Sequence, residues 1–357
     1  GVAEGWAEHA GARHHGAHGG AAARMLDVPE ADFLDFSQNI NPLGAPPMAL
    51  EAARRALEED TGRYPDLSYH GLREALGAYV GVRPERIVPT NGGAEALFLA
   101  ARAAGERGAA VILEPTFSEY APAAEAAGLL PVRRVVRRPE DGFALDPEAF
   151  TDLDGAAVVF LCNPNNPTGE VLGRRMVMEI SARVRDAGAV LVVDEAFVDF
   201  VPDASVADAV DAHLFVARSF TKFFAIPGLR LGCLICPDAA RVQALQPSWP
   251  VNAVAAAAGT AAARDTGFAE RSVREVARLR DALSTDLAAL PGLTVFAGSA
   301  NFLLVEGPEG LTERLARRGV LVRGCAPFVG LGPAFFRVAV RGEDENGALV
   351  EAVRGAL

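Results

Sequence analysis

Long apolar runs are missing from this sequence. No stretch reaches the roughly 18–20 apolar residues that a membrane-spanning helix needs, and the N-terminus lacks the charged, apolar and small-residue order of a secretory signal. Basic residues are in deficit as well, because 34 Lys and Arg face 46 Asp and Glu, a net charge of −12. Nucleic-acid binding requires a basic face. We therefore expect neither a membrane protein nor a nucleic-acid partner, whereas small anionic ligands need only a few local arginines.

Cysteine is equally scarce, with Cys162, Cys233, Cys236 and Cys325. Cys233 and Cys236 have the CxxC spacing of some zinc and redox sites. The pair lies in the apolar segment LRLGCLICPD, which predicts a buried strand, and residues i and i+3 of a strand point to opposite faces. No second CxxC completes a metal site. We therefore expect no bound metal, reduced cysteines and a cytoplasmic protein.

Apolar residues are plentiful, at 50% of 357, and this length favours two packed subdomains. Between about Pro46 and Pro237, short runs rich in Val, Ile and Leu alternate with amphipathic helical patterns. Such alternation is typical of an α/β fold with a mostly parallel sheet that helices cover on both faces. Seven strands are predicted, at residues 86–89, 109–113, 132–136, 156–162, 189–193, 214–217 and 231–236. Helices are predicted between them at residues 94–104, 120–127 and 174–187.

The pattern changes after Pro250, where one long helical stretch covers residues 251–290. Short strands at 293–296, 302–305, 320–323 and 335–340 and helices at 311–318 and 343–356 then predict a smaller α+β domain. The first 45 residues have little periodicity, and we expect them to wrap onto the body of the protein. The predicted division is a large domain at 46–250 and a small domain made of 1–45 and 251–357.

Polar segments lie at the ends of several predicted strands. Asn163-Pro-Asn-Asn-Pro-Thr-Gly169 follows one strand, Asp194-Glu-Ala-Phe197 the next, and Arg218-Ser-Phe-Thr-Lys222 a third, with Pro227-Gly-Leu-Arg230 before the last. Each segment alone is equally compatible with a turn, a helix cap or a surface lysine. Ligands of open α/β sheets bind outside the carboxyl ends of the strands. The order and shared placement of the segments therefore indicate one site.

The residue types suit a cofactor that has an aldehyde, a pyridine ring and a phosphate. A lysine amine forms an imine with an aldehyde, and burial beside cations depresses the pKa of that amine. A carboxylate keeps a pyridine nitrogen protonated, so that the ring accepts electrons. Backbone amides at a helix start, hydroxyls and a cation hold a phosphate. The sequence supplies these groups as Lys222, Asp194, Asn166, the Asn91-Gly-Gly-Ala94 turn, Ser219 and Arg230.

Over residues 90–230 these motifs resemble those of the fold-type-I, aspartate-aminotransferase-like enzymes, which use pyridoxal 5'-phosphate. The resemblance implies that Lys222 is the Schiff-base lysine, that Asp194 pairs with the pyridine nitrogen and that Asn166 meets the phenolic oxygen. It also implies that Phe117, in Pro115-Thr-Phe117, stacks on the ring. The phosphate would be held by Gly93, Ala94, Ser219 and Arg230.

The same resemblance extends to two residues outside that range. Tyr64, in Arg63-Tyr-Pro-Asp66, is similar to the tyrosine that reaches the phosphate in a neighbouring subunit, which implies a homodimer. Arg337 is similar to the arginine that binds the α-carboxylate of the substrate, the alternative being a charge at a sheet edge. Phe197 departs from the pattern, because many aminotransferases have Tyr at this place. The loss of that phenol makes an aminotransferase less favoured.

Within this group the chain most resembles the L-threonine-O-3-phosphate decarboxylases of cobalamin side-chain synthesis, nearly end to end. The resemblance implies loss of carbon dioxide from a phosphorylated amino acid, most simply L-threonine O-3-phosphate. Candidate substrate contacts are His18, Gly19, Asn39, Arg323 and Arg337, and His18 with two glycines offers an anion nest. The other histidines near the N-terminus are expected in a solvated tail. The distinguishing segments are His18-Gly-Gly20, Leu34–Gly44, Asp194–Phe197, Trp249-Pro-Val-Asn252 and Val322-Arg-Gly-Cys325.

Three other functions stay open. The first is an aminotransferase of the histidinol-phosphate type, because fold and cofactor motifs do not choose between decarboxylation and transamination. The second is a related decarboxylase for another phosphorylated or phosphonate amino acid of a natural-product pathway. The sequence begins at Gly1 rather than Met, so the native chain could be longer. The third, a cofactor-binding regulator, calls for a basic helix-turn-helix pattern that the sequence lacks.

Overall fold

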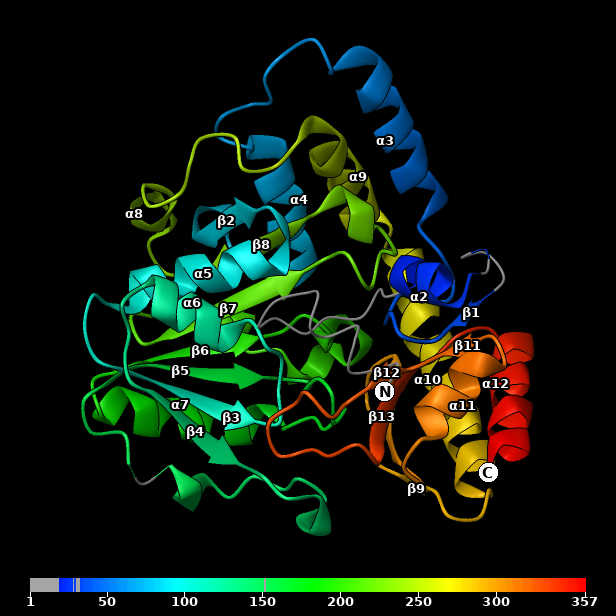
Figure 1. The fold of residues 1–357 in the computed structure, drawn as a ribbon. Helices are drawn as coiled ribbons and strands as arrows, with labels where there is room; N and C mark the ends of the chain where they lie inside the picture. The colour runs from blue at the N-terminus through cyan, green and yellow to red at the C-terminus, as the bar shows by residue number, and fades with distance from the viewer. Residues whose placement is uncertain (1–18, 28, 30–32, 151) are drawn as a thin grey trace.

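The computed structural model describes residues 19–27, 29, 33–150 and 152–357. At its centre is a seven-stranded sheet with the order β2-β8-β7-β6-β5-β3-β4 (Figure 1). β8 runs antiparallel to both of its neighbours, and the other neighbouring strands pair in parallel. The predicted seven-stranded, mostly parallel sheet is confirmed. Its strands are β2 (Ile87–Thr90), β3 (Ala109–Glu114), β4 (Val132–Val136), β5 (Ala156–Cys162), β6 (Val190–Asp194), β7 (Leu214–Ser219) and β8 (Gly232–Ile235).

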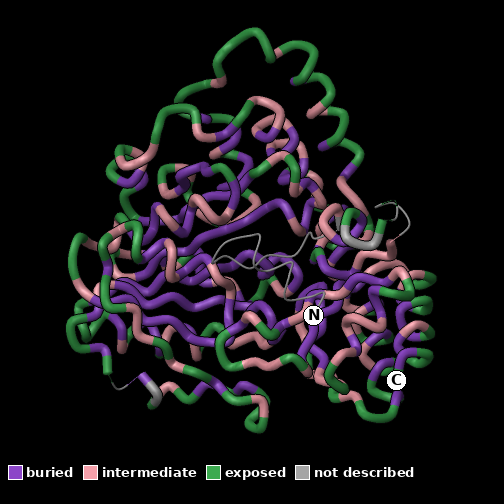
Figure 2. The backbone as a smooth tube through the Cα atoms, in the orientation of Figure 1, coloured by how far each residue is buried: buried purple, intermediate pink, exposed green. Residues whose placement is uncertain are grey.

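Helices cover both faces of this sheet, which explains why its inner strands are mostly apolar, whereas the edge strand β4 carries Arg133 and Arg134. Successive residues of β6 alternate between two buried clusters, with Leu191 in one and Val192 in the other. The second cluster includes α5 (Gly92–Ala104) and α6 (Tyr120–Ala126), and the first includes α7 (Arg174–Asp186) on the opposite face (Figure 1). Figure 2 shows the inner strands of the sheet buried and the exposed residues concentrated in the outer loops and helices.

A second, four-stranded antiparallel sheet lies beyond the carboxyl ends of the parallel strands, in the order β12-β13-β10-β9 (Figure 1). Its strands are β9 (Thr294–Val295), β10 (Phe302–Glu306), β12 (Arg323–Gly324) and β13 (Phe335–Ala339), with α11 (Leu311–Arg317) and α12 (Glu343–Ala356) beside them. The single strand predicted at 320–323 is wrong. β11 (Val320–Leu321) pairs instead with β1 (Leu34–Asp35), and only β12 joins the four-stranded sheet.

The single helix predicted over 251–290 is also wrong, because two helices, α9 (Ala253–Arg264) and α10 (Thr266–Ala288), share this stretch. Asp265 separates them and caps α10 by accepting a hydrogen bond from the Phe268 amide at 3.0 Å. α9 packs against α3 (Pro47–Glu59) and α4 (His70–Val80), with its alanines in the large core. α10 passes from that core at Val276 to the small core at Leu279. The predicted domain division stays a prediction. In the structure, the boundary between the large core and the small core falls within α10, between Val276 and Leu279.

The described part of the N-terminal arm is tied to the body, as expected. α2 (Gly19–Leu26) places Ala22 against Ala316 and Leu321, and the Asn41 amide hydrogen-bonds to the Lys222 carbonyl at 3.0 Å. α8 (Ala239–Gln243) is the remaining α-helix among the described residues. No helix in the described part of the chain has the length and apolarity to cross a membrane. The cytoplasmic location and the absence of a nucleic-acid partner stay predictions.

A substitution at Gly232, the first residue of β8, tests how closely this strand approaches the Gly92 turn. A Cβ at this position would lie 2.6 Å from the carbonyl carbon of Gly92 and 2.7 Å from the Arg218 carbonyl oxygen, both rigid backbone atoms. We expect Gly232→Ala to lower the free energy of unfolding by about 1–3 kcal/mol, because the backbone must shift. Chemical unfolding measures this change.

Gly347→Ala is the matched control, because Gly347 lies in α12 and a Cβ there meets open space. The free energy of unfolding of this variant should rise by about 0.5–1 kcal/mol, the usual advantage of Ala over Gly in a helix. Equal stability of the two variants would contradict the close packing described for Gly232.

Candidate active site

A cavity of about 340 Å³ opens where the carboxyl ends of the central strands face the N-terminal arm and the small domain. Loops that follow five strands of the large sheet contribute to its wall, as the motif positions predicted. The structure brings together eleven of the predicted residues: Asn39, Gly93, Ala94, Phe117, Asn166, Asp194, Ser219, Lys222, Arg230, Arg323 and Arg337.

Three predicted residues are not among those that line the cavity. Tyr64 is 77% exposed and stacks on Trp249, with 4.5 Å between the ring centroids, rather than lining the cavity of its own chain. His18 lies outside the described residues, and Gly19 begins α2. Their contacts with a substrate phosphate therefore stay predictions.

Asp194 ends β6 with its carboxylate almost completely buried. Its Oδ1 accepts a hydrogen bond from the Ala196 amide at 3.0 Å, and its Oδ2 accepts one from the Tyr120 hydroxyl at 2.7 Å. Burial raises the pKa of Asp194, whereas the Tyr120 bond and the charge of Lys222 lower it. Sequence reasoning missed Tyr120, whose only sequence signal is its position three residues after Phe117 at the start of a predicted helix.

Lys222 is half-buried in the segment that follows β7. Its Nζ lies 3.4 Å from the Ser219 Oγ and 5.6 Å from the centroid of the Phe197 ring. Burial lowers the pKa of Lys222, Arg230 and Arg337 act in the same direction, and Asp194 opposes them. The lysine thus has the environment that makes an amine a better nucleophile near neutral pH.

The start of α5 forms a cradle for an anion. Gly92 has a φ of +77°, and a Cβ on it would collide with Arg230, while a Cβ on Gly93 would lie 3.0 Å from the Ser219 Cβ. Glycine at both places therefore lets the turn approach the hydroxyl and the guanidinium. The Ser219 Oγ also lies 3.0 Å from the Oγ1 of Thr221, which the sequence analysis did not select. Amides at a helix start, two hydroxyls and a cation are the groups that bind a phosphate.

Arg337 lies in β13 between β12 and β10, so the alternative of a charge at a sheet edge is wrong. Its buried guanidinium has only neutral hydrogen-bond partners among the described residues: the Ser37 carbonyl at 3.0 Å, the Asn166 Oδ1, and the Asn39 Oδ1 at 3.2 Å once that amide is oriented toward it. Burial lowers the pKa of Arg337 to about 10. A buried cation without a carboxylate partner favours an anionic ligand.

Arg323 provides a second buried cation on the neighbouring strand. It pairs with Arg337 in the register of β12 and β13, and its guanidinium lies 5.6 Å from the centroid of the Phe328 ring. Burial lowers the pKa of Arg323 as well. The cavity therefore holds two cationic subsites besides the cradle at α5.

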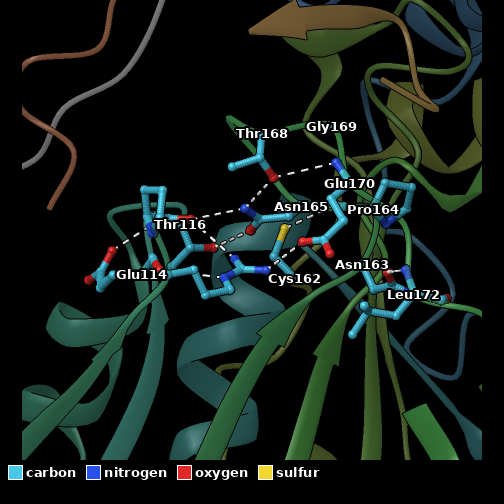
Figure 3. A network of polar contacts seen from close by, with 12 residues as sticks. Glu114, Thr116, Cys162, Asn163, Pro164, Asn165, Thr168, Gly169, Glu170 and Leu172 are labelled. Atoms are coloured by element: carbon cyan, nitrogen blue, oxygen red, sulfur yellow. Dashed lines mark hydrogen bonds and ion pairs between the residues drawn. The ribbon is translucent and has the colours of Figure 1, made fainter. Parts of the chain in front are cut away.

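A hydrogen-bond network joins the loop after β3 to the loop after β5 (Figure 3). The Asn165 Nδ2 donates to the Pro115 carbonyl at 2.9 Å and to the Thr168 Oγ1 at 2.8 Å, while its Oδ1 accepts from the Thr116 Oγ1 at 2.8 Å. Buried Arg137 supports both loops, since it pairs with Glu170 at 2.8 Å and donates to the Pro115 carbonyl at 3.4 Å. Phe117 and Asn166 each directly follow a residue of this network, which fixes their separation.

The comparisons with known proteins agree with this geometry. The family model "Aminotransferase class I and II" matches residues 31–353. The chain belongs to this family. The fold-type-I prediction is thereby confirmed.

Three relatives of the chain illustrate its place among the class I and II aminotransferases. The threonine-phosphate decarboxylase of Salmonella typhimurium is 38% identical over 96% of both chains. The adenosylcobalamin biosynthesis bifunctional protein CobDQ of Leptospira interrogans is 34% identical over 90% of this chain and 38% of its own length. The solved histidinol-phosphate aminotransferase of Clostridium acetobutylicum superposes with a TM-score of 0.82 at 28% identity, covering 90% of this chain and 98% of its own.

The remaining sequence candidates concern cysteine. Cys233 lies in β8 and Cys236 directly follows it, and both are buried and free, as the strand interpretation expected. No group of three or more metal-ligating side chains occurs within residues 19–27, 29, 33–150 and 152–357.

The Asn165 network can be tested by Asn165→Ala. The variant removes two hydrogen bonds between the two loops and one within the loop after β5, so Phe117 and Asn166 lose their fixed separation. We expect the affinity for pyridoxal 5'-phosphate to fall about tenfold, the equivalent of roughly one lost hydrogen bond. Titration of the apo protein, followed by cofactor absorbance, measures this affinity.

Asn163→Ala is the matched control, because the Asn163 amide bridges to Leu172 within its own loop, at 3.0 and 2.8 Å, and not to Pro115. Asn163→Ala should lower the free energy of unfolding by about as much as Asn165→Ala does. Its affinity for the cofactor should change less. Equal losses of affinity in both variants would count against a positioning role for Asn165.

Proposed function

We propose that this chain removes the α-carboxylate of L-threonine O-3-phosphate as carbon dioxide and leaves (R)-1-aminopropan-2-yl phosphate. The observation that carries the proposal is the pair of buried arginines, Arg323 and Arg337, in register on adjacent strands that line the cavity of Lys222. Two cationic subsites match a substrate with a carboxylate at one end and a phosphate at the other. The 38% identity to a threonine-phosphate decarboxylase supports the same substrate.

Pyridoxal 5'-phosphate is the cofactor, and the residues of the cavity fit it. The glycine cradle accepts a phosphate only because no Cβ fills it, and the buried Asp194 carboxylate faces the same cavity as the Phe117 ring. Lys222 would hold the aldehyde carbon covalently and Asp194 the ring nitrogen. Asn166, whose Oδ1 already accepts from Arg337, offers its Nδ2 donor to the phenolic oxygen. The bound cofactor supplies an electron sink for the bond that breaks at the substrate Cα.

The side chains of the protein then decide which bond breaks. Arg337 binds the α-carboxylate, while Arg323 and Asn39 face the phosphate. Because both ends of the substrate are held, rotation at Cα is restricted to one arrangement, in which the carboxylate departs. Lys222, whose amine has a lowered pKa, is the group placed to return a proton to Cα.

Transamination of a phosphorylated amine is the alternative within the family. Phe197 argues against it, because its ring, 5.6 Å from the Lys222 Nζ, offers no phenol to the cofactor oxygen. A regulator without catalysis is less favoured still, since binding alone does not require both buried arginines of the substrate subsites.

A single-turnover reaction of the holoenzyme with L-threonine O-3-phosphate tests the function. We expect one equivalent of carbon dioxide per active site, with the cofactor returned to its starting absorbance, because the electrons go back to Cα as a C–H bond. The cofactor spectrum and the evolved gas are recorded together. Formation of the pyridoxamine form without carbon dioxide would instead establish an aminotransferase, and no reaction would direct the search to other phosphorylated or phosphonate amino acids.

We also propose that the chain works as a homodimer. Much of α3 and of the segment after it is exposed (Figure 2). Their large apolar side chains include Met48, Leu50, Leu57, Tyr64 and Leu67, each more than half exposed. Large apolar side chains exposed along one segment are a feature of protein interfaces. In a two-fold dimer this face would present Tyr64 to the cofactor phosphate of the partner.

Subunit mixing tests this arrangement with Tyr64→Ala and Lys222→Ala, each nearly inactive alone. In a mixed dimer one site carries both substitutions and the other carries neither. Equal amounts of the two variants, dissociated and reassociated, should therefore recover about a quarter of wild-type decarboxylation. Recovery of no activity, with mixed dimers detected by mass, would show that Tyr64 acts within its own chain.

A further inference from the structure

Tyr120 is a fully buried polar residue in an otherwise apolar part of the core. It is the first residue of α6, and its ring stacks on Phe160 with 5.1 Å between centroids and an interplanar angle of 10°. Phe117 meets it edge-on at 5.9 Å. These contacts hold the phenol in one orientation, with its hydroxyl donating to the Asp194 Oδ2 at 2.7 Å.

Packing alone does not account for the hydroxyl. A phenylalanine would fill the same space between Phe160 and Phe117, and burying a hydroxyl costs free energy unless it finds a partner. The partner in this case is Asp194, a carboxylate that lines the cavity. The phenol thus acts on the site through Asp194, since Tyr120 itself does not line the cavity.

The two oxygens of Asp194 are held by donors from different elements. Oδ1 accepts from the Ala196 amide in the loop after β6, and Oδ2 accepts from Tyr120 in α6. One donor on each oxygen fixes the rotation of the carboxyl group. Because the same phenol packs against Phe117, the carboxylate and the ring-stacking residue share one support.

The titratable groups around Asp194 come from three elements. Tyr120 lies in α6, Cys162 in β5 opposite Asp194, and Lys222 after β7. Burial holds the pKa of Tyr120 well above its usual value and raises that of Cys162 to about 12, so both groups stay neutral near pH 7. Lys222 supports the carboxylate only while its amine is charged. The Tyr120 hydrogen bond is therefore the support that persists when the lysine is neutral.

We propose that Tyr120 is a positioning residue that keeps Asp194 ionised and in one orientation, so that Asp194 retains a proton on the ring nitrogen of the cofactor. The inference rests on the proposed cofactor binding and not on the identity of the substrate. A hydrogen bond to the charged form of a carboxylate makes it a weaker base. Without Tyr120, Asp194 becomes a stronger base and competes for the proton of the ring nitrogen.

The decisive variant is Tyr120→Phe, which keeps the ring and removes the donor. We expect the apparent pKa of the ring nitrogen in the holoenzyme to fall by about one unit, the size of one hydrogen bond to a charged group. The kcat should fall about tenfold by the same conversion, with KM changed by less than about twofold, because Arg323 and Arg337 are untouched. NMR of the holoenzyme carrying ring-15N pyridoxal 5'-phosphate reads the nitrogen directly.

Tyr79→Phe is the matched control. The Tyr79 hydroxyl donates to the Asp199 Oδ1 at 2.6 Å, so this variant removes the same kind of bond at a carboxylate outside the cavity. Both variants should melt at a similar, slightly lower temperature, and only Tyr120→Phe should change the 15N signal. Fluorotyrosine at position 120 keeps the shape and is a stronger donor, so the ring-nitrogen pKa should shift in the opposite direction.

The outcomes separate this inference from the proposed function. If the wild-type chain fails to bind the cofactor through Lys222, the proposed function and the inference both fall. If it binds and the 15N signal is the same in wild type, Tyr120→Phe, Tyr79→Phe and the fluorotyrosine protein, Tyr120 has only a packing role and the inference is overturned. A signal that follows donor strength at position 120 supports it, whatever the substrate.

Discussion

The buried carboxylate of Asp194 is the group on which the arrangement of the site depends. An ionised carboxyl group at the end of a central strand is costly unless donors and an opposite charge surround it. The protein meets this requirement from three directions, with an amide from its own loop, the phenol of Tyr120 and the amine of Lys222. These two hydrogen bonds and the charge of Lys222 involve the segments after β3, β6 and β7. Phe117 and Lys222 therefore line the same cavity as the carboxylate.

Side chains alternate between the two faces of a strand, and this alternation keeps other charges away from the Asp194 carboxylate. Glu195 and Arg218 directly neighbour Asp194 and Ser219 in sequence, yet they form a separate buried ion pair at 3.1 Å, to which Asp199 adds a second carboxylate at 2.7 Å from Arg218. Successive residues point to opposite faces of a strand, so this network does not line the cavity. Charges close in sequence thus serve two separate purposes, one structural and one directed to the ligand.

The substrate side of the cavity has the opposite electrostatic character. Arg337 is buried among neutral oxygens, and Arg323 stands beside it on the next strand. Burying a guanidinium without a carboxylate costs free energy, which an anionic ligand can offset. This cost explains how a chain with a net charge of −12 can still bind an anion. The local burial of the guanidinium, and not the total charge of the chain, sets the preference for an anionic ligand.

The sequence by itself determined the parallel sheet, its seven strands and most of the site, because apolar runs of strand length and polar motifs after them are local signals. Lys222, Asp194 and the Gly92–Gly93 turn could be read from such signals. Only the tertiary structure decided the contacts between distant loops: the Tyr120 bond to Asp194, the Asn165 network, the Thr221 hydroxyl and the register of Arg323 with Arg337. It also divided the stretches 251–290 and 320–323, where a cap at Asp265 and pairing with β1 override continuous local patterns. A hydrogen-bond partner far away in sequence leaves no periodicity behind, and it is defined only once the chain has folded.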